Sequence, residues 1–156
     1  MGAKLVNEAV GGASKGDEKG NAIKGYKNPV LTVDGILMER GTLLLVRRGR
    51  EPEKGKLALP GGIVEYGETT EEAVARELKE ETGISTKPVR LLGVYSDPAR
   101  DPRGHFITVA YVLSRESGEL KAGDDAADVV FLPISDLPHL AFDHDRIVAD
   151  FLREQK

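Results

Sequence analysis

A single helix, predicted near the middle of the chain, constrains the fold more than any other feature of the sequence. Thr69 followed by Glu72 is typical of a capping box, in which two side chains satisfy free N–H groups at the start of a helix. Gly83 is a typical helix stop, so the pattern predicts a helix over about residues 70–82. The chain has 156 residues, which suits one domain with a hydrophobic core and is too short for two ordinary domains.

Three acidic side chains share one face of this helix. Glu77, Glu80 and Glu81 are spaced i, i+3 and i+4, and residues at that spacing are neighbours on a helix surface. Charged helix faces are commonly solvated surfaces. Carboxylates on a rigid element are also the hard oxygen ligands that Mg²⁺ or Mn²⁺ requires, and a bound cation would relieve their mutual repulsion. The helix alone leaves both interpretations open.

Short apolar and β-branched runs, separated by turn signals, account for most of the remaining sequence. Predicted strands cover residues 29–38, 42–47, 57–64, 89–95, 106–113 and 129–132. The third run is interrupted by Pro60-Gly61-Gly62, and residues 143–153 have the apolar spacing of a closing amphipathic helix. Strands mixed with two separated helices predict an α/β domain in which helices cover both faces of a sheet.

Composition and charge exclude several classes of protein. Residues 1–26 contain six glycines and no sustained hydrophobic period, which indicates a flexible N-terminal tail or leader before a domain at 27–156. No apolar run approaches the roughly 20 residues that span a bilayer, so we expect no membrane association. The net charge of −4 disfavours a nucleic-acid-binding protein. The absence of cysteine excludes disulfides and thiolate metal sites and fits a cytoplasmic location.

The segment from Gly62 to Ile84 resembles the Nudix box. That box has a glycine, five residues, a glutamate, seven residues and then Arg-Glu-aliphatic-x-Glu-Glu-x-Gly-aliphatic, and this sequence matches every defined position. Chance agreement has a probability on the order of 10⁻⁹ from average residue usage, which disfavours a merely solvated acidic face. The resemblance extends from about Pro29 to the C-terminus. It implies the Nudix fold, an α/β/α sandwich with a mixed β-sheet and a loop–helix–loop box, and hydrolysis of a nucleoside diphosphate linked to another moiety.

The resemblance also implies a role for each matched residue of the box. Mg²⁺, with Mn²⁺ as a substitute, would be bound by box carboxylates and one backbone carbonyl. These metal-binding positions are Gly61, Glu68, Glu77, Glu80 and Glu81. Glu68 lies on the loop before the helix and would reach a second or third metal through water. Arg76 would hold the glutamates in position through ion pairs. Two or three Mg²⁺ ions would neutralise the diphosphate and activate a water, so no covalent intermediate is needed.

Two flanking segments resemble those of the compact ADP-ribose pyrophosphatases of this family. One is the loop at 96–105, Ser-Asp-Pro-Ala-Arg-Asp-Pro-Arg-Gly-His, and the other is the basic run at 47–62. Their arginines are expected to bind the substrate, because guanidinium groups contact phosphates bidentately. The candidate substrate-binding residues are Arg47, Arg48, Arg100 and Arg103, with the small Gly62 letting the backbone approach. The alternative is an ordinary turn with solvated charges.

The leading hypothesis is therefore hydrolysis of ADP-ribose, a small-molecule nucleotide, to AMP and ribose 5-phosphate. The alternatives are hydrolysis of another nucleotide, such as a nucleoside triphosphate, a dinucleoside polyphosphate or NADH, and a non-catalytic domain that senses ADP-ribose. Relatives often carry tryptophan where this chain has Leu57 and Phe131, and the sequence has no tryptophan. The residue that would stack on adenine is thus left open, and a homodimer is compatible with the sequence.

A general base could come from outside the box. The acidic segment at 118–128 supplies Asp125, with Asp124 as second choice, on a loop that could close over substrate. The alternatives are an acidic turn that caps a strand, a box glutamate or metal-bound hydroxide. His105, His139 and His144 lack metal-ligand spacing, so we expect ordinary polar histidines there.

Overall fold

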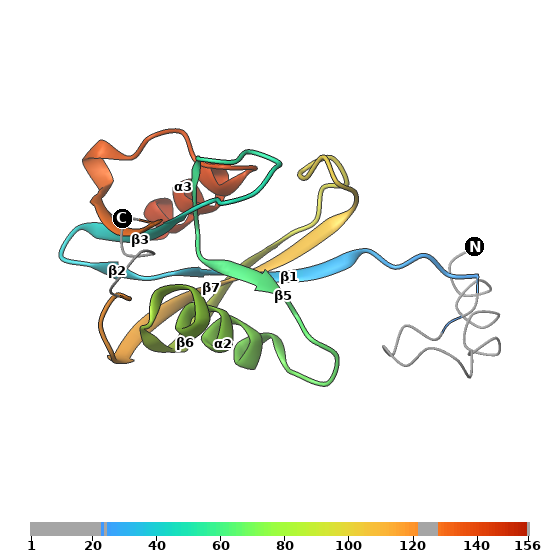
Figure 1. The fold of residues 1–156 in the computed structure, drawn as a ribbon, viewed down its shortest axis with the longest axis horizontal. Coiled ribbons are helices and arrows are strands. Elements are labelled where there is room, and N and C mark those ends of the chain that lie inside the picture. Colours follow the sequence, from blue (N-terminus) through green and yellow to red (C-terminus); the bar gives the residue numbers. More distant parts are fainter. Residues whose placement is uncertain (1–22, 24, 122–127, 156) are drawn as a thin grey trace.

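A mixed four-stranded sheet is part of the computed structural model, which describes residue 23 and residues 25–121 and 128–155. β1 (Val30–Ile36) lies inside this sheet, between β5 (Gly61–Ile63), its antiparallel neighbour, and β7 (Phe106–Ser117), its parallel neighbour. β6 (Ser85–Tyr95) pairs antiparallel with β7 and completes the sheet. Because β5 begins at Gly61, the order of the strands places the start of the box directly against β1 (Figure 1).

A second, antiparallel sheet is built around β3 (Thr42–Arg47). Its neighbours are β2 (Met38–Glu39), β4 (Leu57–Ala58) and β8 (Val129–Pro133). β8 is followed by a 3₁₀ turn, η2 (Ile134–Asp136). All four central residues of β3 are buried, as expected for a strand that lies inside a core.

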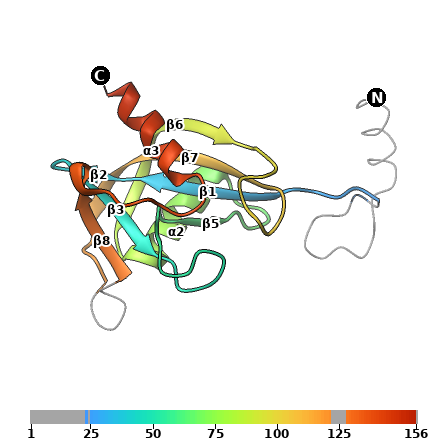
Figure 2. The same ribbon diagram turned by 90° about the horizontal axis from the view of Figure 1, so that it is seen from above.

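Helices α2 and α3 lie on opposite sides of the sheets (Figures 1 and 2). α2 (Thr70–Thr82) packs Val74 and Leu78 into one hydrophobic cluster, and α3 (His144–Glu154) packs Ile147 and Phe151 into another. Each helix buries an apolar stripe and leaves a charged face in solvent. The predicted α/β/α arrangement with a mixed sheet is confirmed. No helix in the described part of the chain is long and apolar enough to cross a membrane.

The predicted boundaries of α2 are also confirmed. The Thr69 hydroxyl accepts a hydrogen bond from Glu72 N at 3.0 Å, and the Glu72 carboxylate accepts one from Thr69 N at 2.8 Å. Gly83 ends the helix with φ at 84°, a left-handed conformation that glycine adopts without strain.

The strands differ from the prediction at their ends. The run at 29–38 is divided, because β1 ends at Ile36 and β2 starts at Met38. β6 begins at Ser85, four residues before the predicted start, and β7 continues to Ser117. These extensions carry polar side chains, and backbone pairing between the two strands sustains them past the end of the apolar pattern.

Candidate active site

Arg76 on α2 is the centre of an ion-pair network among the carboxylates of the Nudix box. Its guanidinium donates to both carboxylate oxygens of Glu68, at 2.7 and 3.0 Å, and to Glu77 at 2.8 Å and Glu80 at 3.2 Å. It also donates to the backbone oxygen of Ile63 at 3.1 Å. Hydrogen bonding to Glu68 is the main reason that the pKa of Arg76 is raised. One cation therefore connects the helix to the loop before it.

Glu81 lies deeper in the fold than the other box carboxylates. Its Oε1 accepts a hydrogen bond from Gly61 N at 2.7 Å. Burial raises the pKa of Glu81 to about 8, and the hydrogen bond from Gly61 opposes that rise only in part. Burial also raises the pKa of Glu77 above its ordinary value. A partly buried carboxylate with so high a pKa favours either a proton or a cation beside it.

Neither Gly61 nor Gly62 has room for a Cβ unless a neighbouring group moves. A Cβ on Gly61 would lie 2.0 Å from the backbone oxygen of Val33, and a Cβ on Gly62 would lie 2.4 Å from the carboxylate carbon of Glu77. The first contact is with backbone, which cannot move aside. The backbone of this loop consequently lies directly against β1 and the helix carboxylates, as a loop that approaches a metal or a phosphate must.

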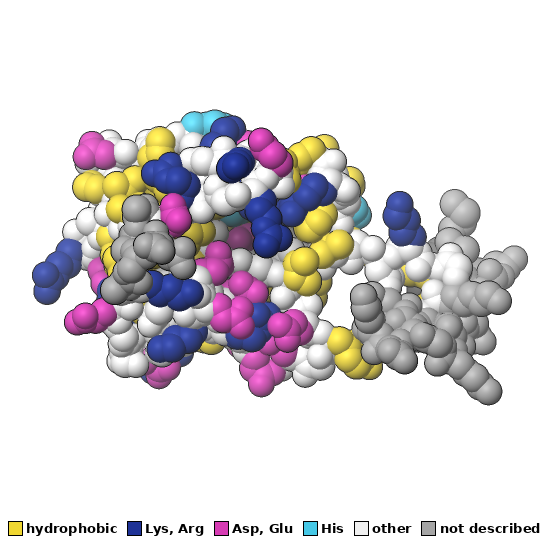
Figure 3. Space-filling view, in the orientation of Figure 1, with side chains coloured by type: hydrophobic (Ala, Val, Ile, Leu, Met, Phe, Trp, Pro, Cys, Tyr) yellow, Lys and Arg dark blue, Asp and Glu magenta, His cyan; other side chains and the backbone are white. Residues whose placement is uncertain are grey.

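Gly61 and Gly62, here called the glycine loop, form one end of a cleft of about 410 Å³ together with Glu81. The other walls come from the segment after β3, the loop at 96–105 and the start of α3. The four arginines predicted to bind substrate, Arg47, Arg48, Arg100 and Arg103, line this cleft, as do Gly61 and Gly62. On the face seen in Figure 3, acidic side chains gather below the centre and basic side chains lie above them.

Arg47 and Arg48 make no carboxylate contact within hydrogen-bond distance in the described part of the chain. Arg47 donates to the backbone oxygen of Gly55 at 2.7 Å, and Arg48 donates to that of Pro52 at 2.8 Å. Both guanidinium groups are thus oriented by neutral carbonyls and keep their positive charge available in the cleft.

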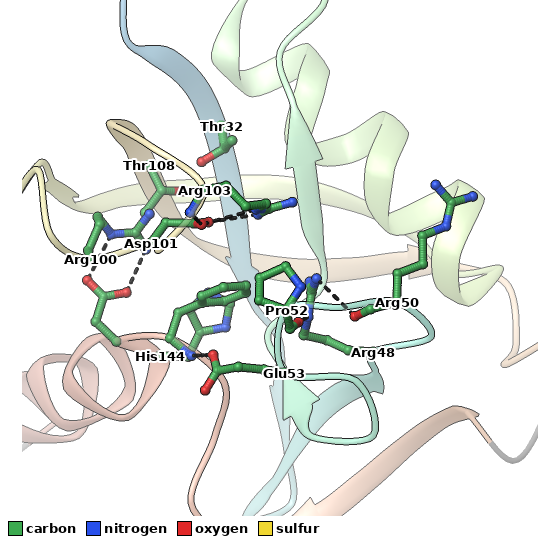
Figure 4. Close-up of polar contacts among 12 residues, drawn as sticks. Thr32, Arg48, Arg50, Pro52, Glu53, Arg100, Asp101, Arg103, Thr108 and His144 are labelled. Atoms are coloured by element: carbon green, nitrogen blue, oxygen red, sulfur yellow. Dashed lines mark hydrogen bonds and ion pairs between the residues drawn. The ribbon is translucent and has the colours of Figure 1, made fainter.

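Arg100 and Arg103 differ, because each is paired with an aspartate (Figure 4). Arg100 donates to both oxygens of Asp143 at 2.6 and 2.9 Å, and only 6% of its side chain is exposed. Arg103 donates to both oxygens of Asp101 at 2.7 and 3.0 Å. Burial raises the pKa of Asp101, but the hydrogen bonds from Arg103 outweigh it and leave that pKa below its ordinary value. Arg100 ties the loop to α3, while the more exposed Arg103 stays on the cleft wall.

Phe142 and Phe106 place two aromatic rings among these arginines. The guanidinium carbon of Arg48 lies 4.7 Å from the centre of the Phe142 ring. That of Arg103 lies 4.6 Å from the Phe106 ring and 5.6 Å from the Phe142 ring. Phe142 has a left-handed backbone, with φ at 52°, and its N–H donates to a carboxylate oxygen of Glu53 at 2.5 Å. No local pattern in the sequence indicates these contacts, because the two rings come from distant segments.

A buried polar group beneath the glycine loop was also missed. Asp34 on β1 accepts a hydrogen bond from the Thr108 hydroxyl of β7 at 2.6 Å, and His144 Nε2 lies 3.7 Å from the same carboxylate oxygen. All three residues are buried, and burial raises the pKa of Asp34. An aspartate inside the apolar run of β1 was the available signal. His105 is exposed and contacts the Ser96 backbone oxygen, whereas His144 is buried in this group.

The donor set suits a divalent metal, although it is not gathered around one point as it stands. In the described ranges, no group of three or more histidine or acidic side chains is close enough to hold an ion. Arg76 instead occupies Glu68, Glu77 and Glu80. The hard oxygen donors, the raised pKa of Glu81 and the glycine cradle nevertheless fit Mg²⁺ or Mn²⁺. Asp124 and Asp125 lie outside the described residues.

Similar proteins are found both by sequence and by structure. An ADP-ribose pyrophosphatase from Methanocaldococcus jannaschii is 54% identical over 128 residues, which is 82% of this chain and 76% of that protein. The NUDIX domain of Shewanella oneidensis NrtR, crystallised with ADP ribose, is 30% identical with a TM-score of 0.72, over 85% of this chain and 92% of that one.

A bifunctional NMN adenylyltransferase/ADP ribose pyrophosphatase from Francisella tularensis, crystallised with AMP and a Mn ion, is 29% identical with a TM-score of 0.70. The likeness covers 85% of this chain but only 43% of that longer protein. The NUDIX domain model matches residues 28–154, which is most of the sequence. With that match and the 54% identity to the Methanocaldococcus jannaschii relative, the chain belongs to the NUDIX family.

Proposed function

We propose that this protein is a metal-dependent hydrolase that converts ADP-ribose and water to AMP and ribose 5-phosphate. The observation that carries the proposal is the shared cleft in which Glu81 and the glycine loop face the arginines of two flanking segments. A diphosphate could therefore reach the box and the basic groups at the same time. The proposal is supported by the 54% identity to an ADP-ribose pyrophosphatase and by the NUDIX domain that was crystallised with ADP ribose.

In this proposal the box residues hold Mg²⁺, with Mn²⁺ as a substitute. Glu77, Glu80, Glu81 and the Gly61 carbonyl would be the ligands, and Glu68 would reach a further ion through water. The bound ion would neutralise charge on the diphosphate and lower the pKa of the attacking water. Arg76 positions the carboxylates and is not placed to contact substrate, because its donors are committed to the box glutamates and a backbone oxygen.

We propose that the arginines divide their work according to their partners. Arg47 and Arg48 keep their charge and would contact the phosphates, together with the backbone at Gly62. Arg100 is almost buried against Asp143 and would position the loop. Arg103 is neutralised by Asp101 and lies beside two aromatic rings, so it would present a planar surface to the nucleotide.

The proton of the attacking water needs an acceptor. We keep Asp125 as the proposed general base and Asp124 as the second choice, because the box carboxylates are assigned to metal. An Asp125→Asn variant should bind Mn²⁺ and ADP-ribose normally and lose kcat. Wild-type kcat in both Asn variants would assign the proton to a box glutamate or to bound hydroxide.

The decisive experiment is a substrate panel. The protein should be inert in chelator and, with Mg²⁺, should hydrolyse ADP-ribose faster than ATP, diadenosine polyphosphates or NADH, with AMP and ribose 5-phosphate identified by chromatography. Glu77→Gln should lower kcat at least roughly 100-fold. Glu71→Gln, a change on the exposed first turn of α2, is the matched control and should not. Faster turnover of a triphosphate would replace the proposed substrate.

A sensing role is the second candidate, because the NrtR domain belongs to the structural neighbours and was crystallised with ADP ribose. Tight binding of ADP-ribose without turnover of any compound would support it. The intact box of this chain favours hydrolysis instead.

We further propose a catalytic domain at 27–156 that acts in the cytoplasm on small nucleotides, with neither nucleic acid nor membrane as a partner. Residues 1–26 would be a dispensable tail, and the sequence is compatible with a homodimer. Light scattering on the purified chain tests the assembly, and a monomer mass would exclude the dimer.

A further inference from the structure

The segment Leu59–Gly61, which precedes the box helix, is held by hydrogen bonds at each of its residues. Gly61 N donates to Glu81 at 2.7 Å, and the Pro60 backbone oxygen accepts from Gly35 N at 2.9 Å. Leu59 N donates to Nδ1 of His144 at 3.0 Å. Glu81 is one of the proposed metal ligands. His144 is not, so it holds this segment independently of the metal ligands.

The contacts of His144 fix which nitrogen carries its proton. Nδ1 accepts the hydrogen bond from Leu59 N, so that atom has no proton. A neutral imidazole then carries its hydrogen on Nε2, which faces the Asp34 carboxylate at 3.7 Å. The imidazole therefore lies between the backbone of Leu59 and the buried Asp34 carboxylate on β1.

Asp34 is itself held in place from the other side. The Thr108 hydroxyl donates to its Oδ2 at 2.6 Å, and Thr108 is completely buried. The Asp34 side chain also packs against the glycine loop, because a Cβ on Gly61 would come within 2.6 Å of Asp34 Oδ1. β1 and α3 thus contact this short piece of backbone directly, and β7 holds the Asp34 side chain in place.

We infer that His144, oriented by Asp34 and Thr108, is a positioning residue that sets the backbone of Leu59–Gly61 for metal binding. The sequence offered no reason to assign His144 such a role. This inference rests on the proposed metal site but not on the identity of the substrate. Residues that orient ligands without touching the metal typically change metal affinity by roughly 10- to 100-fold.

The test measures Mn²⁺ binding directly, from the electron paramagnetic resonance signal of free Mn²⁺ during titration without substrate. His144→Leu removes both contacts and should weaken binding at least about tenfold. His144→Asn places an amide oxygen near the position of Nδ1, so it should restore binding to within about threefold of wild type. His139→Asn is the matched control, because His139 lies shortly before α3 and its side chain is 73% exposed. The Mn²⁺ affinity of this variant should equal that of wild type.

Thr108→Val keeps the side-chain shape and removes the hydrogen bond to Asp34, so it tests the same group without altering the loop contact. We expect it to weaken Mn²⁺ binding severalfold. Wild-type affinity in this variant overturns the inference, even if His144→Leu does not fold. Equal losses in the Leu and Asn variants of His144 overturn it as well, because a general packing defect would produce that pattern.

Kinetics separate this role from the proposed reaction. In a position-144 variant the Mg²⁺ concentration for half-maximal rate should rise in parallel with the loss of Mn²⁺ affinity, while KM for ADP-ribose at saturating Mg²⁺ stays unchanged. A raised KM with unchanged metal dependence would assign His144 to substrate binding instead. If the protein hydrolyses no ADP-ribose, the proposed function fails, yet the Mn²⁺ titration still decides the role of His144.

Discussion

Replacing Glu81 by glutamine should stabilise the metal-free protein at alkaline pH while it lowers kcat at least roughly 100-fold. Burial raises the pKa of Glu81 to about 8 from an ordinary value of 4.5. Between these values the folded state holds a proton that the unfolded state has released, so the free energy of unfolding falls as pH rises. The substituted glutamine carries no charge at any pH, and its amide oxygen could still accept the hydrogen bond from Gly61.

The size of the effect follows from the same interval. A difference of about 3.5 pH units corresponds to at most about 5 kcal/mol. Glu81 is only partly shielded from water, and screening reduces the expected gain to roughly 2 kcal/mol. For a domain of this size that gain raises Tm by roughly 4–8 °C. Below pH 4.5 the wild-type carboxyl is protonated in both states, and the difference between variant and wild type disappears.

The assay is thermal unfolding in chelator at about pH 4.5, 6.5 and 8.5, which spans the interval between the two pKa values, with Glu71→Gln as the control on the same helix. Wild type should lose stability across this range relative to Glu81→Gln, and adding Mg²⁺ at the highest pH should raise the Tm of the wild type more than that of the variant. A Glu81→Gln protein that is less stable than wild type at the highest pH, or equally shifted at every pH, would refute the reasoning.

Three further changes test other parts of the site. Gly62→Ala places a methyl group 2.4 Å from the Glu77 carboxylate carbon, so we expect a loss of Mn²⁺ affinity of at least about tenfold with little change in Tm, measured by titration and by calorimetry. Asp101→Asn removes the carboxylate that holds Arg103, so KM for ADP-ribose should rise severalfold with kcat nearly unchanged, as measured by steady-state kinetics. An unchanged KM would exclude the proposal that Arg103 presents a planar surface to the nucleotide. Deletion of residues 1–26 should leave kcat and Tm within experimental error.

Local signals in the sequence were sufficient to predict helices α2 and α3, the approximate positions of the strands and the Nudix box. The capping box and Gly83 set the ends of α2 because helix termination depends on nearby residues. The spacing of Glu77, Glu80 and Glu81 required only the helical repeat. β6 was shortened in the prediction because its first residues are polar and are held in the strand by β7, a separate segment further along the chain.

The walls of the cleft could not be predicted in the same way. The Arg100–Asp143 pair joins residues 43 positions apart, and the Thr108–Asp34 bond joins residues 74 positions apart. A single sequence shows the side chains but not which distant charge each one meets. For that reason the sequence could not distinguish Arg100, whose aspartate partner is distant, from Arg47, which donates to a backbone oxygen. The partner of Arg103, Asp101, is only two residues away.

The position of His144 has a consequence for biosynthesis. His144 contacts Leu59, which lies 85 residues earlier in the chain. β1 pairs with β7, about 75 residues further along the chain. At translation rates of roughly 5–20 residues per second, the loop at Leu59 leaves the ribosome on the order of ten seconds before its anchor does. The Leu59 backbone of the nascent chain therefore lacks its contact with His144 until the start of α3 has been made, and any chain released before α3 would lack that anchor.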